Sequence, residues 1–213
     1  MQTVDSWVLT RFKELHEGTV TDAVADGDHV LLTRKSLPQT RFGILKATDV
    51  TAADVEPLLD GDVDFIVNIP RAGIFGGDAI KLMEAHGVPW GGLGDGMRAA
   101  RFTNPREYVP FPYEFVVSGL KRHSRVESVA YVDSRRLRVS RTGDLPDVVL
   151  YIEDTYQAEV VTVNFALDRC SPFDIFAATN PNAGPTNNAK EAAERADVEI
   201  LRWGPTLGRL NRP

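Results

Sequence analysis

Residues 120–141 carry a group of basic side chains that could bind phosphate. The window holds seven basic residues and two acidic ones, although the whole chain has a formal net charge of −6. Its basic residues are Lys121, Arg122, Arg125, Arg135, Arg136, Arg138 and Arg141. Because such cations neutralise nucleic-acid phosphates, the window predicts a nucleic-acid-binding surface. The alternative is an ordinary solvated face, since most charged side chains lie at protein surfaces.

Two glycine-bearing loops are the next candidates for a phosphate contact. The first offers Asn68, Arg71 and Gly73, and the second offers Asn180 and Thr186. Each loop follows an apolar run and precedes a helix-like stretch, where backbone N–H groups and the helix dipole can bind an anion. Neither has the Gly-Lys-Ser/Thr sequence of a P-loop or a complete dinucleotide fingerprint. Simple turns are therefore the alternative interpretation.

Other reactive residue types show no catalytic spacing. The four histidines are dispersed and do not have the spacing of metal ligands. Cys170 has no neighbouring histidine or second cysteine, so we expect a buried thiol rather than a nucleophile. The glycine-dense segment 91–96 predicts a tight turn, in which Asp95 is a weak candidate for a metal ligand.

The chain also contains an internal repeat at an offset of 110 residues. Residues 63–73 and 173–184 are both apolar runs that open with Asp and close with Asn, Pro and Ala-Gly. Helix-like stretches follow at 78–87 and 188–197, and each returns to a short apolar run. Matching at a fixed offset indicates duplication of a structural unit. Chance alignment of two strand–turn–helix units is the alternative.

Local patterns predict the same elements in both halves. In the first half we expect a helix over 7–16, strands over 29–34 and 41–46, and a helix over 51–59 that begins at Thr51. In the second half we expect a helix over 113–123 and strands over 128–133, 136–140 and 147–152. Residues 157–169 alternate like a strand, but a helix is favoured because parallel strands need a crossover connection.

These elements predict an α/β protein made of two duplicated halves, each a mixed β-sheet flanked by helices. The first half spans 1–101 and the second spans 113–213. Residues 102–112 hold three prolines and are interpreted as a linker.

The end of the chain resembles the closing segment of restriction-endonuclease-like proteins, the PD-(D/E)XK superfamily. The similarity rests on the strand 174–181 with its Thr-Asn, the Thr-capped helix from 186 with spaced alanines, and the strand at 198–203. The helix–strand–strand–strand–helix–strand order at 113–180 is also the core order of that family. The resemblance therefore implies a restriction-endonuclease-like fold for both halves.

The resemblance also implies where a nuclease site would lie. Active members carry an Asp on the second core strand and a Glu-x-Lys pair on the third, and the carboxylates bind a divalent metal ion. In the first half, Asp28 and Lys46 fit, but Ile44 stands where a carboxylate is needed. In the second half, Asp147 or Asp133 fits the Asp, and Glu153 or Asp154 fits the third strand without its lysine. Each half is thus incomplete, and Mg²⁺ is expected only if the halves share a composite site.

Three functions follow as hypotheses. The first is a prokaryotic protein that associates with DNA or RNA and has a largely degenerate nuclease site, for example an accessory of a DNA-processing or defence system. The second is an active metal-dependent nuclease with a composite site that combines Asp28 and Lys46 with Glu153, Asp154 or Asp147. The third is a small-ligand-binding or protein-interaction module, in which the two glycine-bearing loops form a cleft.

Composition narrows the cellular setting. The chain has no uninterrupted apolar stretch of about 18 residues, so we expect no membrane-spanning helix. Its single cysteine excludes an internal disulfide and fits a reducing compartment. No signal peptide is apparent at the first residues, and we therefore expect a cytoplasmic protein.

Overall fold

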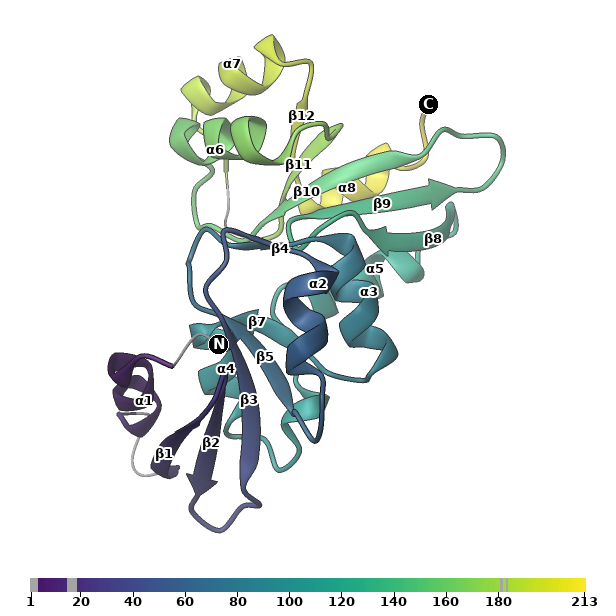
Figure 1. Ribbon diagram of the computed structural model, residues 1–213. Helices are drawn as coiled ribbons and strands as arrows, with labels where there is room; N and C mark the ends of the chain where they lie inside the picture. Colours follow the sequence, from purple (N-terminus) through teal and green to yellow (C-terminus); the bar gives the residue numbers. More distant parts are fainter. Residues whose placement is uncertain (1–3, 15–18, 181, 183) are drawn as a thin grey trace. The chain divides into compact units, whose positions relative to one another are not determined.

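The computed structural model describes residues 4–14, 19–180, 182 and 184–213. The chain divides into two compact units, unit 1 (Met1–Pro110) and unit 2 (Phe111–Pro213). Each unit contains a five-stranded mixed β-sheet with helices packed on it, which confirms the predicted α/β class (Figure 1). Among the described residues, no helix is both long and apolar enough to cross a bilayer.

Unit 1 begins with a helix and three antiparallel strands, and two parallel strands follow. Its elements are α1 (Ser6–Lys13), β1 (Val20–Asp26), β2 (His29–Arg34), β3 (Thr40–Leu45), β4 (Asp49–Val50), α2 (Ala52–Val55), a 3-10 turn (Glu56–Leu58), β5 (Phe65–Asn68), β6 (Ile74–Phe75), α3 (Gly77–Ala85), β7 (Trp90–Gly92), α4 (Leu93–Ala99) and a second 3-10 turn (Pro105–Glu107). The main sheet has the order β1-β2-β3-β5-β7, in which β3, β5 and β7 are parallel. The short strands β4 and β6 form a separate parallel pair.

Unit 2 has the same order of helices and main-sheet strands. Its elements are α5 (Tyr113–Lys121), β8 (Val126–Tyr131), β9 (Arg136–Arg141), β10 (Val148–Glu153), α6 (Val160–Cys170), β11 (Ile175–Ala178), α7 (Asn187–Arg195), β12 (Glu199–Arg202) and α8 (Trp203–Arg209). The sheet order is β8-β9-β10-β11-β12, with β10, β11 and β12 parallel. Two units with one topology are the outcome that a duplication predicts.

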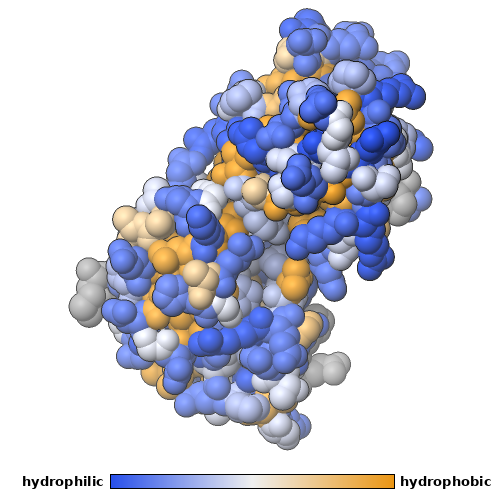
Figure 2. Space-filling model, turned by 90° about the vertical axis from the view of Figure 1, so that its right-hand side faces the viewer, coloured by the Kyte–Doolittle hydropathy of each residue, from blue (hydrophilic) through white to orange (hydrophobic). Residues whose placement is uncertain are grey.

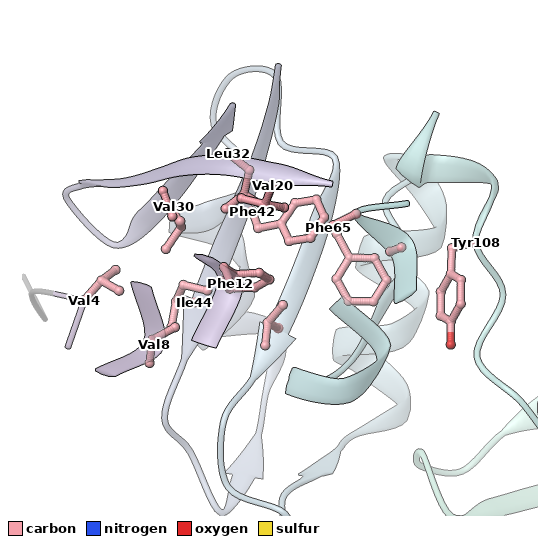
Figure 3. Packing of buried hydrophobic residues seen from close by; sticks show 14 residues of the cluster. Val4, Val8, Phe12, Val20, Val30, Leu32, Phe42, Ile44, Phe65 and Tyr108 are labelled. Atoms are coloured by element: carbon pink, nitrogen blue, oxygen red, sulfur yellow. The ribbon is translucent and has the colours of Figure 1, made fainter. Parts of the chain in front are cut away.

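The hydrophobic cores also use equivalent positions. In unit 1, α1 and α4 cover one sheet face, and Figure 3 shows the α1 side chains Val8 and Phe12 packed against strand residues. The ring centroids of Phe12 and Phe42 are 5.9 Å apart in an edge-to-face arrangement. In unit 2, α5 and α8 cover the corresponding face, and Leu150 on β10 takes the place of Phe42 on β3. The opposite face is covered by α2 and α3 in unit 1 and by α6 and α7 in unit 2.

A repeated aspartate fixes the pairing of the third and fourth main strands. Asp64 accepts hydrogen bonds from the Thr40 hydroxyl at 2.6 Å and from the Arg41 N–H at 3.0 Å. Asp174 accepts a hydrogen bond from the Val149 N–H at 2.6 Å. Each carboxylate therefore ties the start of one parallel strand to its neighbour, and these aspartates are the pair related by the repeat.

A buried arginine is repeated as well. Arg34 at the end of β2 donates from Nε to the Pro38 carbonyl at 2.7 Å and from Nη1 to the Ala100 carbonyl at 3.2 Å. Arg141 at the end of β9 donates in the same way to the carbonyls of Pro146 at 2.7 Å and Leu210 at 3.2 Å. Each guanidinium joins its strand to the segment after the last helix, and burial lowers the pKa of both groups.

Most predicted elements are confirmed, including the helix favoured over 157–169, which is α6. The sequence analysis omitted β1, because a bulge between Val20 and Asp22 breaks its alternation of buried and exposed residues. It was also wrong about residues 91–96, where β7 ends and α4 begins. The Asp95 carboxylate accepts the Gly92 N–H at 3.1 Å and the Tyr108 hydroxyl at 2.8 Å, and these bonds support a helix despite its glycines.

The proline-rich segment from residue 102 packs on unit 1 instead of forming a free linker. Tyr108 is buried, and its ring contacts Phe102 and Phe65 with centroids 5.5 and 5.9 Å away. Arg34 donates a further hydrogen bond to the Phe102 carbonyl. Residues up to Pro110 therefore belong to unit 1.

Arg34, which joins β2 to the segment after α4, should contribute to the stability of unit 1. Arg34→Ala removes a buried donor and leaves several carbonyls without it, so the free energy of unfolding should fall by about 2–4 kcal/mol. Urea denaturation followed by tryptophan fluorescence measures the change. Lys35→Ala is the control, because Lys35 is exposed and adjacent. Equal effects of the two substitutions would contradict the structural role of Arg34.

Candidate functional site

Polar side chains gather at the edge of unit 2 where its parallel strands end. Glu153 is the last residue of β10, Asp154 follows it, and Thr179 follows β11. Arg135 joins them from the turn before β9, and its carbonyl accepts the Ile152 N–H at 2.8 Å. We call these four residues the carboxyl-edge cluster. Ligands of open α/β sheets commonly bind outside the carboxyl ends of the strands, which makes this cluster the candidate site.

Glu153 is the most buried acid of the cluster, with a side chain 12% exposed. Its Oε2 lies 3.9 Å from Arg135 Nη1 and accepts the Tyr151 hydroxyl at 3.4 Å, while Oε1 accepts the Asp154 N–H at 3.2 Å. Burial raises the pKa of Glu153, and the positive charge of Arg135 opposes that shift only in part. Glu153 is therefore an acid whose proton is held more tightly than usual, as in many functional sites.

Asp154 lies beside Thr179 at the end of the neighbouring strand. The Thr179 hydroxyl contacts Asp154 Oδ1 at 3.2 Å and the Glu153 carbonyl at 3.1 Å, and its N–H donates to that carbonyl at 2.8 Å. Burial raises the pKa of Asp154, and the Thr179 hydrogen bond opposes the shift. The cluster thus combines two perturbed carboxyl groups with one guanidinium and one hydroxyl.

Asp133 lies next to the cluster but is occupied by its own turn. Its Oδ1 accepts the N–H groups of Arg135 at 2.7 Å and Arg136 at 2.8 Å. Its Oδ2 accepts the Arg136 Nε–H at 2.8 Å. Both oxygens are therefore engaged in shaping the turn, and Asp133 is poorly suited to hold a cation.

Asp147 lies at the wrong end of β10 to act with Glu153. It precedes the strand and sits 3.8 Å from Arg138, whereas Glu153 ends the strand. Six residues of extended chain separate the two carboxylates by about 20 Å. One metal ion needs ligands within about 2.6 Å, so the prediction that both belong to one site is wrong for this pair.

The candidate nuclease residues of unit 1, Asp28 and Lys46, lie at the edge of its sheet where the parallel strands end. The Ile44 N–H donates to the Asp28 carbonyl at 2.9 Å, which places Asp28 near the end of β3. Lys46 is engaged by Asp5, with 2.9 Å between Nζ and the carboxylate, and this hydrogen-bonded pair lowers the pKa of Asp5. Asp28 Oδ1 is buried and has no hydrogen-bond partner among the described residues.

The described parts of the two units show no group of side chains that could bind a metal ion. Among the described residues, no three His, Cys, Asp or Glu side chains lie close enough to share an ion. A composite site with Mg²⁺ would need ligands from both units, and it stays a prediction. Cys170 is buried, and burial raises the pKa of its thiol to about 11, so it is a poor nucleophile at neutral pH.

The basic window does not form one patch. Arg135 and Arg136 lie at the start of β9, whereas Arg125 lies near its end, because its carbonyl accepts the Thr142 N–H at 2.9 Å. The ends of β9 are about 17 Å apart. Lys121, at the end of α5, and Arg122 are exposed, and so is Arg125. The face drawn in Figure 2 is mainly hydrophilic, with hydrophobic areas between the hydrophilic side chains.

Three arginines of the window, Arg136, Arg138 and Arg141, have partners within unit 2. Arg138 is half exposed but lies near Asp147, as described above. Arg141 is buried and donates to backbone carbonyls, so its prediction as a nucleic-acid contact is not supported by its position. Arg136 binds Asp133 and the Pro172 carbonyl, the latter at 3.1 Å.

The glycine-bearing loops use most of their polar side chains locally. The buried Asn68 amide accepts the Ala47 N–H at 3.1 Å and donates to the Ala47 carbonyl at 2.8 Å. A side chain at Gly73 would collide with that amide, because its Cβ would overlap Asn68 Nδ2. This close approach, and not a positive φ, explains the glycine.

The remaining loop candidates divide between turn formation and solvent exposure. Asn180 Oδ1 accepts the Asn182 N–H at 3.0 Å, and the Thr186 hydroxyl accepts the Ala189 N–H at 3.2 Å as the N-cap of α7. Arg71 is exposed. Of the five predicted loop residues, Arg71 is therefore the side chain best placed to meet an external anion.

Two residues at the carboxyl edge of unit 2 were missed by the sequence analysis. Tyr156 follows β10 closely, and this residue is 73% exposed. Arg202 ends β12 and is exposed. The available signal was their position just after apolar strands that we expected to be parallel, since such residues share one edge of a sheet.

Comparisons with known proteins identify no relative of this chain. No protein-family model matches it, and no curated protein or solved structure matches it.

The raised pKa of Glu153 predicts a pH-dependent effect on stability. The folded protein binds this proton more tightly than the unfolded chain, so the group disfavours folding as the pH rises above about 4.3. Glu153→Gln should therefore raise the melting temperature at pH 7.5, and the gain should vanish near pH 4. Differential scanning fluorimetry at both pH values measures this.

The control for that experiment is Glu127→Gln, which changes an exposed carboxylate on β8. It should leave the transition nearly unchanged at both pH values. A lower melting temperature for Glu153→Gln at pH 7.5 would mean that the ion pair with Arg135 outweighs the cost of burial.

Proposed function

We propose that this protein associates with nucleic acid through unit 2, on a restriction-endonuclease-like fold whose nuclease site is largely degenerate. The proposal rests on the carboxyl-edge cluster. The family's active residues lie on the second and third core strands, and the turn before β9 and the end of β10 supply Arg135 and Glu153. The order α5-β8-β9-β10-α6-β11 agrees with the core order of the family.

The state of the cluster supports binding rather than cleavage. Asp133 uses both oxygens within its turn, and Thr155 stands where the Glu-x-Lys pair would have its lysine. Glu153 and Asp154 are the acids left at this edge, and burial makes both harder to ionise. A divalent ion needs more hard oxygen ligands than these two side chains offer, although water can complete its shell.

The exposed cations support the contact with nucleic acid. Lys121, Arg122 and Arg125 project from the end of α5 and the following turn, where they can neutralise backbone phosphates. These contacts carry no sequence information, because phosphates are alike in every sequence. We therefore infer an electrostatic, sequence-independent mode of association.

Binding to a labelled 20-base-pair duplex, followed by fluorescence anisotropy at 50 and 200 mM salt, tests the proposal. Lys121→Ala combined with Arg122→Ala should weaken binding and reduce the slope of log K against log salt by about 2, because each phosphate contact contributes about 0.9. The matched control is Lys190→Ala combined with Arg195→Ala, which removes two exposed cations from α7. If the unaltered protein binds neither this duplex nor a single-stranded oligonucleotide at 50 mM salt, the proposal is overturned.

The same protein should not cleave DNA. We expect supercoiled plasmid incubated with the protein and Mg²⁺ or Mn²⁺ to stay intact, because Thr155 replaces the lysine of active members and Asp133 uses both carboxylate oxygens in its own turn. Agarose electrophoresis measures nicking. If cleavage occurs, Glu153→Gln and Lys46→Ala identify which unit supplies the active residues, and the degenerate state of the site is refuted.

A further inference from the structure

The two units differ at the equivalent carboxyl edge, which makes unit 1 an internal reference for unit 2. In unit 1, Leu45, Asn68 and Gly92 form one row across β3, β5 and β7. In unit 2, the corresponding row across β10, β11 and β12 is Glu153, Ala178 and Arg202. The same backbone positions thus carry an arginine in unit 2 where unit 1 has only a glycine.

The loop after the third strand shows a second difference. The Gly76 N–H donates to the Val50 carbonyl at 2.8 Å in unit 1, and the Thr186 N–H donates to the Ala158 carbonyl at 3.1 Å in unit 2. Val50 and Ala158 are therefore equivalent, and the residue two positions earlier is Thr48 in unit 1 and Tyr156 in unit 2. Unit 2 has an aromatic ring where unit 1 has a small hydroxyl side chain.

Tyr156 is held in place without being buried. On one side of it, Thr179 binds Asp154 and the Glu153 carbonyl. On the other side, the Ala158 N–H donates to the Gly184 carbonyl at 3.3 Å. Among the described residues, neither the ring nor the hydroxyl of Tyr156 has a partner, although an exposed aromatic face is costly in water. The loop is anchored on both sides and presents the ring to solvent.

Arg202 lies next to the same anchored loop. A Cβ at Gly184 would be 3.1 Å from Arg202 Nη2, so the guanidinium passes directly over this glycine. Gly184 is also the residue whose carbonyl binds Ala158, two positions after Tyr156. No ion pair of Arg202 occurs within the described part of the chain, so its charge is available to an external anion. An aromatic face and an available guanidinium thus share one edge of the sheet.

We propose that Tyr156 and Arg202 bind an unpaired nucleotide of single-stranded nucleic acid, with the base stacked on the tyrosine ring and a phosphate on the guanidinium. This inference rests on the proposed association with nucleic acid and adds the strand type and the contact residues. Stacking on an aromatic ring requires a base that is not held in a duplex. The carboxylates of Glu153 and Asp154 would repel a phosphate, so we expect the phosphate on the Arg202 side of the loop.

Binding of a fluorescein-labelled 12-residue oligothymidylate to the full chain tests this inference. Tyr156→Thr, which introduces the residue of unit 1, should weaken binding about tenfold or more, whereas Tyr156→Phe should bind like the unaltered protein. Tyr156→Leu keeps an apolar side chain without an aromatic face and should behave like Tyr156→Thr. Arg202→Gln should reduce the salt slope by about 0.7, the value for one phosphate of a single strand.

A second readout reports stacking directly. An oligonucleotide with one 2-aminopurine should lose fluorescence on binding to the unaltered protein and to Tyr156→Phe, but not on binding to Tyr156→Leu. If Tyr156→Thr and Arg202→Gln bind the oligonucleotide as tightly as the unaltered protein, this inference is wrong while the proposed function stands. If the unaltered protein binds neither duplex nor single strand, the proposed function itself fails.

Discussion

The pairing between the third main strand and its parallel neighbour is the constraint on which each unit depends. In unit 1 it joins β3 to β5, and in unit 2 it joins β10 to β11. The pairing decides which side chains enter the core, because a shift by one residue would turn every side chain to the other face of the sheet. Asp64 and Asp174 bind backbone N–H groups at the start of these pairs and stabilise this register.

The same register also decides what the carboxyl edges can do. Since the strands end level with one another, the residues that follow them become neighbours although they are far apart in the sequence. In unit 1 this edge is closed by local bonds, such as those of Asn68 with Ala47 and of Lys46 with Asp5. In unit 2 it presents Arg202 and Tyr156 beside the perturbed acids. One scaffold therefore carries two edges of different chemistry, and the surrounding core is alike in both.

The buried and the exposed arginines of this protein have different roles. Arg34 and Arg141 lie at equivalent positions, and both donate hydrogen bonds from Nε and Nη1 to backbone carbonyls of their own unit. Arg202 is exposed and Arg122 is exposed, so their charges face solvent. A buried donor that satisfies carbonyls contributes to stability, whereas an exposed cation acts mainly on approaching anions.

The sequence alone determined the α/β class, most helices and strands, and the repeat. These features are encoded locally, in the spacing of apolar residues and in residues matched along the chain. The exceptions have local causes that tertiary bonds overrule: the bulge of β1 hides its alternation, and the bonds of Asp95 support α4 despite its glycines. The segment around Tyr108 looked like a linker because prolines interrupt its pattern, but ring packing holds it on unit 1.

Only the tertiary structure decided which charged and polar residues meet. Asp147 and Glu153 are close in sequence but lie at opposite ends of β10, while Arg135 and Glu153 are distant in sequence and lie 3.9 Å apart. Arg141 and Arg202 have the same side chain, yet one is buried and the other is exposed. The physical reason is that burial and neighbourhood follow from the register of strands and the packing of helices, which bring together residues that no local spacing connects.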